Sequence, residues 1–211
     1  MDRPRTPIRS LAELAAAEAA CTRCPLYRDA TQVVPGEGPA KPSLLIVGEQ
    51  PGDKEDLAGR PFVGPAGRVL DAALEAAGIP RAETFVTNAV KHFKHEMRGK
   101  RRLHKKPNAY EIDRCRWWLD LERGLLRPAV VVALGATAAR GVVGRPVAIG
   151  KMRGTAMPLA DGSRLVVTIH PSYLLHIQDR EDKRVAYQRF VADLRLAATV
   201  LAEGRRPASV A

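Results

Sequence analysis

Four short apolar runs constrain the fold of this chain more than any other feature of its sequence. They are Ser43–Val47, Thr84–Thr87, Ala129–Leu134 and Leu165–Ile169. Their apolar residues are mostly continuous rather than alternating, which is typical of strands buried on both faces. Stretches with helical patterning lie between and after them, at Gly67–Ala77, Glu111–Leu125, Ala136–Val143 and Val185–Leu201. Strands that alternate with helices predict an α/β fold, a three-layer α/β/α sandwich around a short parallel sheet of about four strands.

Length and charge limit the organisation of the chain and its partners. With 211 residues it can bury one sizeable core, so we expect a single domain with short tails at about residues 1–10 and 203–211. The net charge of +11 favours a polyanion such as nucleic acid as partner. We expect no membrane span, because no apolar run approaches about 20 residues, and no secretory signal. A cytoplasmic monomer is the expected form of the protein.

Residues suited to chemistry follow each of the four apolar runs. The first run ends at Gly48, Glu49 and Gln50, the second at Asn88 and the last at His170, and the third is followed by a glycine turn. In an open parallel sheet the ligand crevice lies beyond the carboxyl ends of the strands. One cleft would therefore collect a carboxylate, two amides and an imidazole. Taken singly, the asparagine could be a helix cap and the histidine a core residue, but four strand ends together favour an enzyme with its site in a cleft.

The segment GEQPGDKEDLAGRPFVGPAGR (Gly48–Arg68) is the richest in glycine turns. Glycines allow the backbone to approach a ligand closely, although a loop that only changes direction would also use them. The segment contains neither a Walker phosphate loop nor a dinucleotide-binding GxGxxG pattern. Phe62, which follows Pro61 and precedes Gly64, is a candidate for stacking on a planar base. The alternative interpretation is a small core aromatic.

Three motifs together resemble the signature motifs of the family 4 uracil-DNA glycosylases. They are the glycine-rich segment, TNAVKH (Thr87–His92) and HPSYLL (His170–Leu175), and the similarity runs from about residue 20 to residue 200. The resemblance implies the uracil-DNA glycosylase fold and cleavage of the N-glycosidic bond of uracil in DNA. Gln50 directly after Glu49, and the basic insertion Arg98–Lys106, are similar to the UdgX subgroup, whose members attach themselves covalently to DNA.

The resemblance implies a role for each residue of the expected cleft. Asn88 would bind the edge of uracil through its amide, and Phe62 would stack on the ring of a nucleotide that has left the helix or single strand. Backbone around Gly48 and Gln50 would complete the base pocket. His170 would donate a hydrogen bond to the uracil oxygen as negative charge develops on the leaving base. Bond cleavage itself would need no cofactor.

His104 is the candidate nucleophile. In UdgX-type proteins the histidine of a KRRxHK loop attacks the sugar carbon, and KRRLHK (Lys100–Lys105) matches that pattern. A neutral imidazole is a competent nucleophile, and Glu49 would orient it or balance the charge that develops on the sugar. Two alternatives stay open: a conventional family 4 enzyme that uses water and releases abasic DNA, and a non-enzymatic, metal-bearing nucleic-acid-binding module.

The span Lys91–Lys106 holds eight Lys or Arg residues and one acid, Glu96. Such a run is commonly a solvated face, but beside a base pocket we expect it to lie along DNA phosphates. The candidate phosphate contacts are Lys100, Arg101, Arg102 and Lys105. The expected partner is therefore uracil-containing DNA, single strands included, with free uracil as the product.

Cys21, Cys24 and Cys115 offer three thiolates, two of them at a spacing common to zinc and iron–sulfur sites. Buried free thiols are the alternative. The family resemblance implies a [4Fe–4S] cluster with His92 as the fourth ligand, because His92 stands where family 4 enzymes have a cysteine; His95 is the reserve candidate. A structural zinc ion remains the second possibility for the metal. We expect the cluster to pin the N-terminal segment without taking part in base excision.

Overall fold

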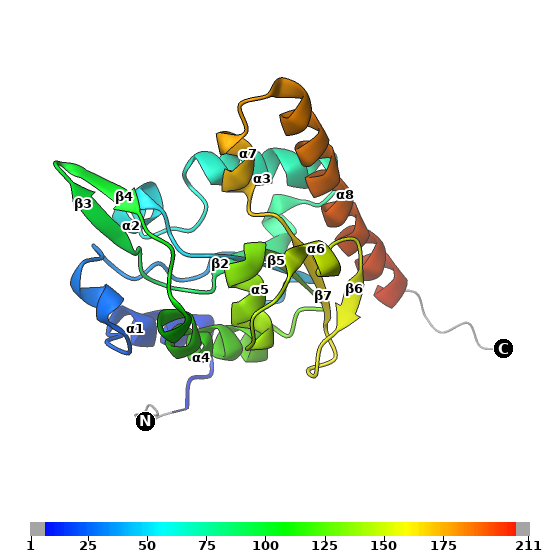
Figure 1. The fold of residues 1–211 in the computed structure, drawn as a ribbon. Coiled ribbons are helices and arrows are strands. Elements are labelled where there is room, and N and C mark those ends of the chain that lie inside the picture. Colours follow the sequence, from blue (N-terminus) through cyan, green and yellow to red (C-terminus); the bar gives the residue numbers. More distant parts are fainter. Residues whose placement is uncertain (1–6, 206–211) are drawn as a thin grey trace.

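The computed structural model describes residues 7–205, and a five-stranded sheet forms its centre (Figure 1). The strands are β1 (Leu44–Gly48), β2 (Thr84–Asn88), β5 (Val130–Leu134), β6 (Ala156–Pro158) and β7 (Arg164–Thr168). Their order is β2-β1-β5-β7-β6, and all neighbours are parallel except β6, which pairs antiparallel with β7. The four parallel strands confirm the four that the sequence predicts. The edge strand β6 is an addition, because three residues are too few to show a pattern.

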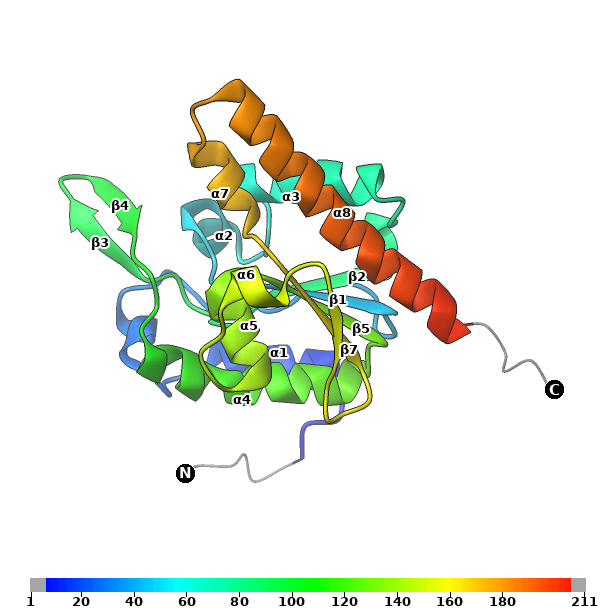
Figure 2. The same ribbon diagram turned by 45° about the vertical axis from the view of Figure 1, so that its right-hand side comes forward.

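Helices cover both faces of the sheet, which confirms the three-layer α/β/α architecture (Figures 1 and 2). The helices are α1 (Leu11–Ala19), α2 (Asp53–Ala58), α3 (Pro65–Ala76), α4 (Ala109–Leu126), α5 (Gly135–Val143), α6 (Ile149–Met152), α7 (Pro171–His176) and α8 (Arg180–Arg205). The four predicted helices correspond to α3, α4, α5 and α8, whereas the other four were not predicted. Because α8 continues to Arg205, residues 203–205 are helical where a tail was expected. Residues 1–6 and 206–211 of the expected tails lie outside the described chain.

The sheet separates two apolar cores. Leu44 and Ile46 of β1 pack with α3 and α8, whereas Leu45 and Val47 pack with α4 and α5. Successive strand residues point to opposite faces, so a strand covered on both sides must be apolar at every position. This explains the continuous runs in the sequence. None of the helices in the described part of the chain has an apolar stretch of membrane-spanning length.

The basic insertion forms a two-stranded antiparallel hairpin, β3 (His95–Arg98) and β4 (Arg101–His104), that projects from the body beside α2 (Figures 1 and 2). Its turn contains Gly99 with a φ of 61°, a left-handed conformation that glycine adopts without strain. The register pairs His95 with His104. His104 therefore lies at the base of the hairpin, next to the body, and not at its tip.

Lys91 is completely buried, which corrects the expectation that the cations from Lys91 to Lys106 all face DNA. Its ammonium lies 2.6 Å from the Glu122 carboxylate of α4, donates to Thr87 Oγ1 at 2.5 Å and lies 3.9 Å from Glu18 of α1. Burial acts to lower the pKa of Lys91, but the two carboxylates outweigh it and raise that pKa. This ionic cluster joins α1 and α4 to the segment that follows β2.

Candidate active site

The carboxyl ends of the parallel strands border a cavity of about 680 Å³. The strand-end residues that the sequence singles out, Glu49, Gln50, Asn88 and His170, all line it, together with Phe62 and His104. The other lining residues are Gly52, Asp53, Lys54, Glu55, Pro65, Ala66, Ser172, Leu175 and His176. The volume lies within the range of about 300–1,000 Å³ typical of small-molecule sites. The parallel sheet thus brings the predicted groups into one cavity.

Phe62 forms one wall of the cavity and has a strained backbone. Its φ of 58° is rare for a residue with a side chain, and such strain is commonly found at functional sites. Gly67 permits this turn, because a Cβ there would lie 1.7 Å from the Phe62 carbonyl oxygen. A Cβ at Gly48 would lie 2.7 Å from Phe62 Cζ and 2.3 Å from Asn88 Oδ1. Glycine at position 48 therefore lets the aromatic ring and the amide reach the same space.

Asn88 ends β2, and its side chain is 3% exposed. Among the residues that the structure describes, its amide has no hydrogen-bond partner. Because Asn88 lines the cavity, its unpaired amide is available to a polar ligand. The amide offers a donor and an acceptor side by side, which matches the edge of a base such as uracil.

His170 is neutral in the resting site. Burial lowers its pKa to about 4, with the nearby His104 adding to that effect and Glu49 opposing it. Its Nδ1 accepts the Ser172 backbone N–H at 3.2 Å and lies 2.7 Å from Ser172 Oγ. Because a backbone N–H can only donate, we assign the ring proton to Nε2. His170 therefore offers one N–H donor, and its ring lies 6.4 Å from the Phe62 ring at an angle of 27°.

His104 and Glu49 meet at the mouth of the cavity. His104 Nε2 lies 3.3 Å from Glu49 Oε1, and the imidazole remains half exposed. Thr137 of α5 donates to Glu49 Oε2 at 2.5 Å. Burial acts to raise the pKa of Glu49, but the contacts with His104 and Thr137 outweigh it and hold that pKa below its ordinary value. Glu49 is therefore a carboxylate that fixes the position of an accessible imidazole.

Gln50 holds the hairpin through its side chain. Its amide nitrogen donates to the carbonyl oxygens of Lys94 and Lys105, each at 3.1 Å, and its amide oxygen accepts the Lys94 backbone N–H at 3.1 Å. Lys94 and Lys105 flank the two strands of the hairpin at its base. The sequence placed Gln50 in the base pocket through its backbone, and the structure adds that its side chain positions the strand that carries His104.

Arg102 forms the second attachment of the hairpin. Its guanidinium lies 2.6 Å from the carboxylates of Asp53 and Asp56 on α2, and 5.5 Å from the centre of the Phe93 ring. Arg102 is thus engaged within the protein rather than free for a phosphate. Asp53 and Asp56 were not identified as functional residues from the sequence. Their spacing places both on one turn of a helix, but it does not indicate that they pair with Arg102, which is distant in the sequence.

The remaining candidate phosphate contacts divide into two kinds. Lys105 pairs with Glu96 at 2.8 Å, both of them exposed. Lys100 and Arg101, at the turn of the hairpin, are exposed and have no interaction partner among residues 7–205. Both side chains are available to an external phosphate, and their contact with DNA stays a prediction.

The three cysteines lie together in one buried apolar cluster with Trp118. Cys21 Sγ accepts the Trp118 indole N–H at 3.1 Å, and Cys115 Sγ accepts the Lys91 backbone N–H at 3.2 Å. Burial raises the pKa of Cys24 and Cys115, so their thiolates need a neighbouring cation. Buried thiols with N–H donors aimed at sulfur fit a metal or cluster.

The fourth metal ligand stays a prediction. His92 is 5% exposed and directly follows Lys91, whose backbone reaches Cys115. Within the described residues, however, no three His, Cys, Asp or Glu side chains are already arranged as a metal-binding group. The reserve candidate, His95, stacks on Phe93 with ring centres 5.0 Å apart at the base of the hairpin.

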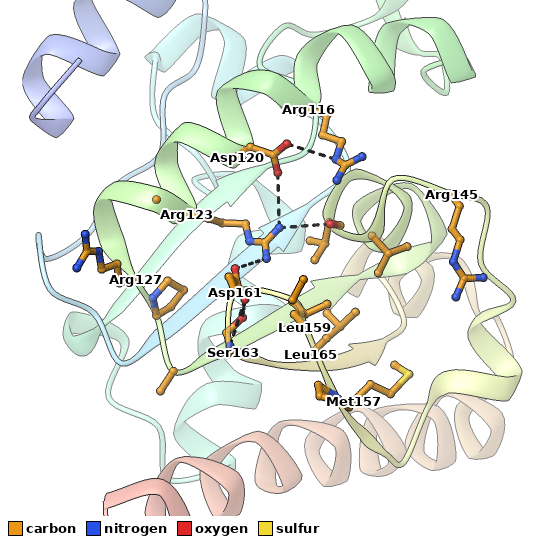
Figure 3. Close-up of a pocket in the computed structure, with 18 of the residues that line it drawn as sticks. Arg116, Asp120, Arg123, Arg127, Arg145, Met157, Leu159, Asp161, Ser163 and Leu165 are labelled. Atoms are coloured by element: carbon orange, nitrogen blue, oxygen red, sulfur yellow. Dashed lines mark hydrogen bonds and ion pairs between the residues drawn. The ribbon is translucent and has the colours of Figure 1, made fainter. Parts of the chain in front are cut away.

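A larger cavity, of about 1,310 Å³, lies at the opposite edge of the sheet (Figure 3). Ala129 and Ser163 line it, and they immediately precede β5 and β7. Its central Arg123 is paired with Asp120 and Asp161, as the dashed lines in Figure 3 show. None of the residues that the motifs single out lines this cavity, so size alone does not identify the reaction site.

Comparison with known proteins agrees with the geometry of the smaller cavity. Residues 35–195 match the model of the uracil DNA glycosylase superfamily. The chain belongs to this superfamily. It is 38% identical over 169 residues to the type-4 uracil-DNA glycosylase of Thermotoga maritima, covering 80% of this chain and 84% of that protein. It is 36% identical over 162 residues to the type-4 uracil-DNA glycosylase of Pyrobaculum aerophilum, covering 74% and 79%. The superfamily match includes the whole of the cavity from Glu49 to His170, and the relatives place the chain in the type-4 family.

Proposed function

We propose that this protein excises uracil from DNA and then becomes attached to the resulting sugar through His104. The names of the type-4 relatives support the excision, as does a cavity with an aromatic wall and an unpaired amide. The attachment rests on one observation: an accessible imidazole lies 3.3 Å from a partly buried carboxylate at the mouth of that cavity. The similarity of the KRRLHK segment to the UdgX subgroup points the same way.

Excision follows from the groups around the base. Uracil lies against Phe62 and is bound along its edge by Asn88. The bond between the sugar C1′ and uracil N1 breaks, and its electron pair leaves with the base. The Nε2–H of neutral His170 stabilises the negative charge that develops on the uracil oxygen, which lowers the barrier because the charge is largest in the transition state. The Glu49 carboxylate balances the positive charge on the sugar.

Attachment uses the lone pair of the His104 imidazole. A ring nitrogen forms a bond to C1′, and the resulting imidazolium loses its N–H proton to solvent, while the uracil anion takes up a proton as it leaves. Glu49 fixes the ring, and the hairpin attachments of Gln50 and Arg102 fix the strand behind it. If water attacked C1′ instead, the same site would release abasic DNA, which is the second candidate reaction.

A denaturing gel tests the attachment. Purified protein is mixed with a labelled single strand that contains one uracil, and the products are heated in detergent. We expect a retarded band with wild type and with the control His95→Ala, which removes the histidine paired with position 104 across the hairpin. We expect no such band with His104→Ala. A wild type that leaves only alkali-labile abasic DNA would assign the reaction to water.

We further propose that Cys21, Cys24 and Cys115 bind a [4Fe–4S] cluster with His92 as the fourth ligand. Their shared burial and the two N–H donors to sulfur support it. When bound, the cluster supplies a structural crosslink between the N-terminal segment and α4, and no step of excision.

Replacement of a cluster ligand should affect folding more than chemistry. We expect Cys21→Ser to lose iron and sulfide and to lower solubility and Tm, while uracil release per folded molecule changes little. Iron, sulfide and zinc analysis of both proteins, with thermal unfolding, measures this. A wild type that is equally stable without bound iron would contradict the cluster, and stoichiometric zinc would assign a structural zinc site.

A further inference from the structure

A groove of about 550 Å³ adjoins the candidate active site, between α3, α7 and α8. The three helices pack side by side on one face of the sheet, as Figures 1 and 2 both show. The groove and the active-site cavity share Pro65 and Leu175 as lining residues, so the two are adjacent. None of the motifs assigns a role to the α3 and α8 walls of this groove.

The rim of the groove carries positive charge that the protein does not neutralise. Arg68 of α3 and Arg180 and Lys183 of α8 are exposed, and none of their side chains has an interaction partner among the described residues. A fourth rim cation, Arg184, pairs with Glu181. The large cavity of Figure 3 also has two exposed arginines, Arg127 and Arg145, but it lies at the opposite edge of the sheet from Glu49 and Asn88. Three unpaired cations beside a uracil-binding cavity fit the phosphates of a nucleic-acid strand.

The floor of the groove is apolar and includes an aromatic ring. Val69, Leu174 and Tyr187 line it, and Leu175 at the junction with the active site is 39% exposed. Apolar and aromatic surface between phosphate-binding cations is the pattern that binds single strands, whose bases can stack on protein. Duplex DNA keeps its base faces inside the helix, so it would contact the rim and leave the floor uncovered.

We propose that this groove binds the nucleotides that flank uracil on one side in single-stranded DNA. Their phosphates pair with Arg68, Arg180 and Lys183, and an unpaired base covers the floor beside Tyr187. In Figure 1 the hairpin and helices α3, α7 and α8 lie on different sides of α2. The cavity is lined by His104 of the hairpin and by Leu175 of α7, so the strand passes from the hairpin, across the cavity, into the groove. The proposal rests on the function proposed above and adds the form of DNA that the site selects.

Charge reversal on the rim tests the groove without depending on excision. Binding of a labelled, uracil-free single strand and of the same sequence as a duplex is followed by fluorescence anisotropy at several salt concentrations. We expect Arg68→Glu and Lys183→Glu each to weaken single-strand binding roughly tenfold and to reduce the salt slope by about one, with a smaller loss for duplex. The matched control is Arg189→Glu, the same kind of charge reversal at an exposed position of α8 outside the groove.

Excision assays show which side of uracil the groove binds on the DNA strand. Trimming the flank on one side of uracil, and not the other, should slow release by wild type, and Lys183→Glu should abolish that difference. The groove proposal is overturned if both rim variants bind single strands as Arg189→Glu does, or if duplex binding is lost equally. A wild type that shows the rim dependence but releases no uracil would refute the glycosylase function while leaving the groove in place.

Discussion

Replacement of Lys91 by Met is expected to lower the free energy of unfolding by about 3–5 kcal/mol, because it leaves buried carboxylates without their cation. Lys91 is completely buried, 2.6 Å from Glu122 and 3.9 Å from Glu18. Both Glu18 carboxylate oxygens lack a hydrogen bond, so the Lys91 charge is what compensates them. A small domain is stable by only about 5–15 kcal/mol, so the loss is a large fraction of the total. Urea unfolding followed by circular dichroism measures it.

A matched control lies three residues further on. Lys94→Met removes an ion pair of similar length, 2.8 Å to Glu111, but this lysine is partly exposed. We expect a loss of about 1 kcal/mol or less there. The double variant Lys91→Met/Glu122→Leu should recover part of the single-variant loss, since an apolar pair can replace a buried ion pair. If both lysine variants lost the same free energy of unfolding, burial would not determine how much the Lys91 ion pairs contribute to stability.

The pH dependence of the Lys91 variant has a definite sign. Burial raises the pKa of Glu18 from 4.5 to about 7, with Lys91 opposing that rise and Glu122 adding to it. The folded state therefore binds this proton more tightly than the unfolded state, and the stability it contributes is lost as pH rises from about 4.5 through about 7. A protonated Glu18 needs no cation. We thus expect Lys91→Met to lose more stability at pH 8 than at pH 5.

The sheet could be predicted because strands buried on both faces appear in the sequence as continuous apolar runs. The hairpin could not be predicted because its strands have no such run. β1 alternates between two cores, so all its residues are apolar. β3 and β4 carry charged residues or histidines at six of their eight positions and are held by Gln50 and Arg102, whose partners are far away in the sequence. Pairing through tertiary contacts gives no local periodicity.

The candidate site shows the same division. Glu49, Asn88 and His170 could be placed together because parallel strands end at one edge of a sheet. Lys91 could not be separated from its neighbours in the basic span, because a charge count does not show which lysine points into the core. The approach of His104 to Glu49 required a family resemblance, since 55 residues separate them and the hairpin geometry decides the distance.

Replacement of His170 by Leu is expected to slow uracil release by about 100- to 1,000-fold, the usual cost of removing one donor to a developing oxyanion. Leucine fills similar space but cannot donate a hydrogen bond. The loss should fall on the maximal single-turnover rate constant and leave the half-saturating protein concentration almost unchanged, because the donor acts on charge that is absent from the bound substrate. Release of labelled uracil is followed with protein in excess over DNA, and a titration of the protein separates the rate constant from the half-saturating concentration.

Two further variants distinguish donation from packing. His170→Gln keeps an N–H donor and should recover part of the rate, whereas Ser172→Ala keeps the backbone N–H that fixes the His170 tautomer and should cost much less than His170→Leu. A His170→Leu variant with a normal single-turnover rate constant and a raised half-saturating concentration would instead give His170 a role in holding the base.

The pH profile of wild type tests which form of His170 acts. Burial lowers the pKa of this imidazole to about 4, so it stays neutral from pH 8 down to about pH 5. If the neutral Nε2–H is the donor, titration of His170 adds no pH dependence over that range. If the imidazolium were the active form, release would quicken about tenfold for each unit of falling pH, because the protonated fraction grows in that proportion above the pKa. A flat profile in wild type, together with the slower single-turnover release by His170→Leu, would assign the stabilisation of the leaving base to a neutral histidine whose pKa burial has lowered.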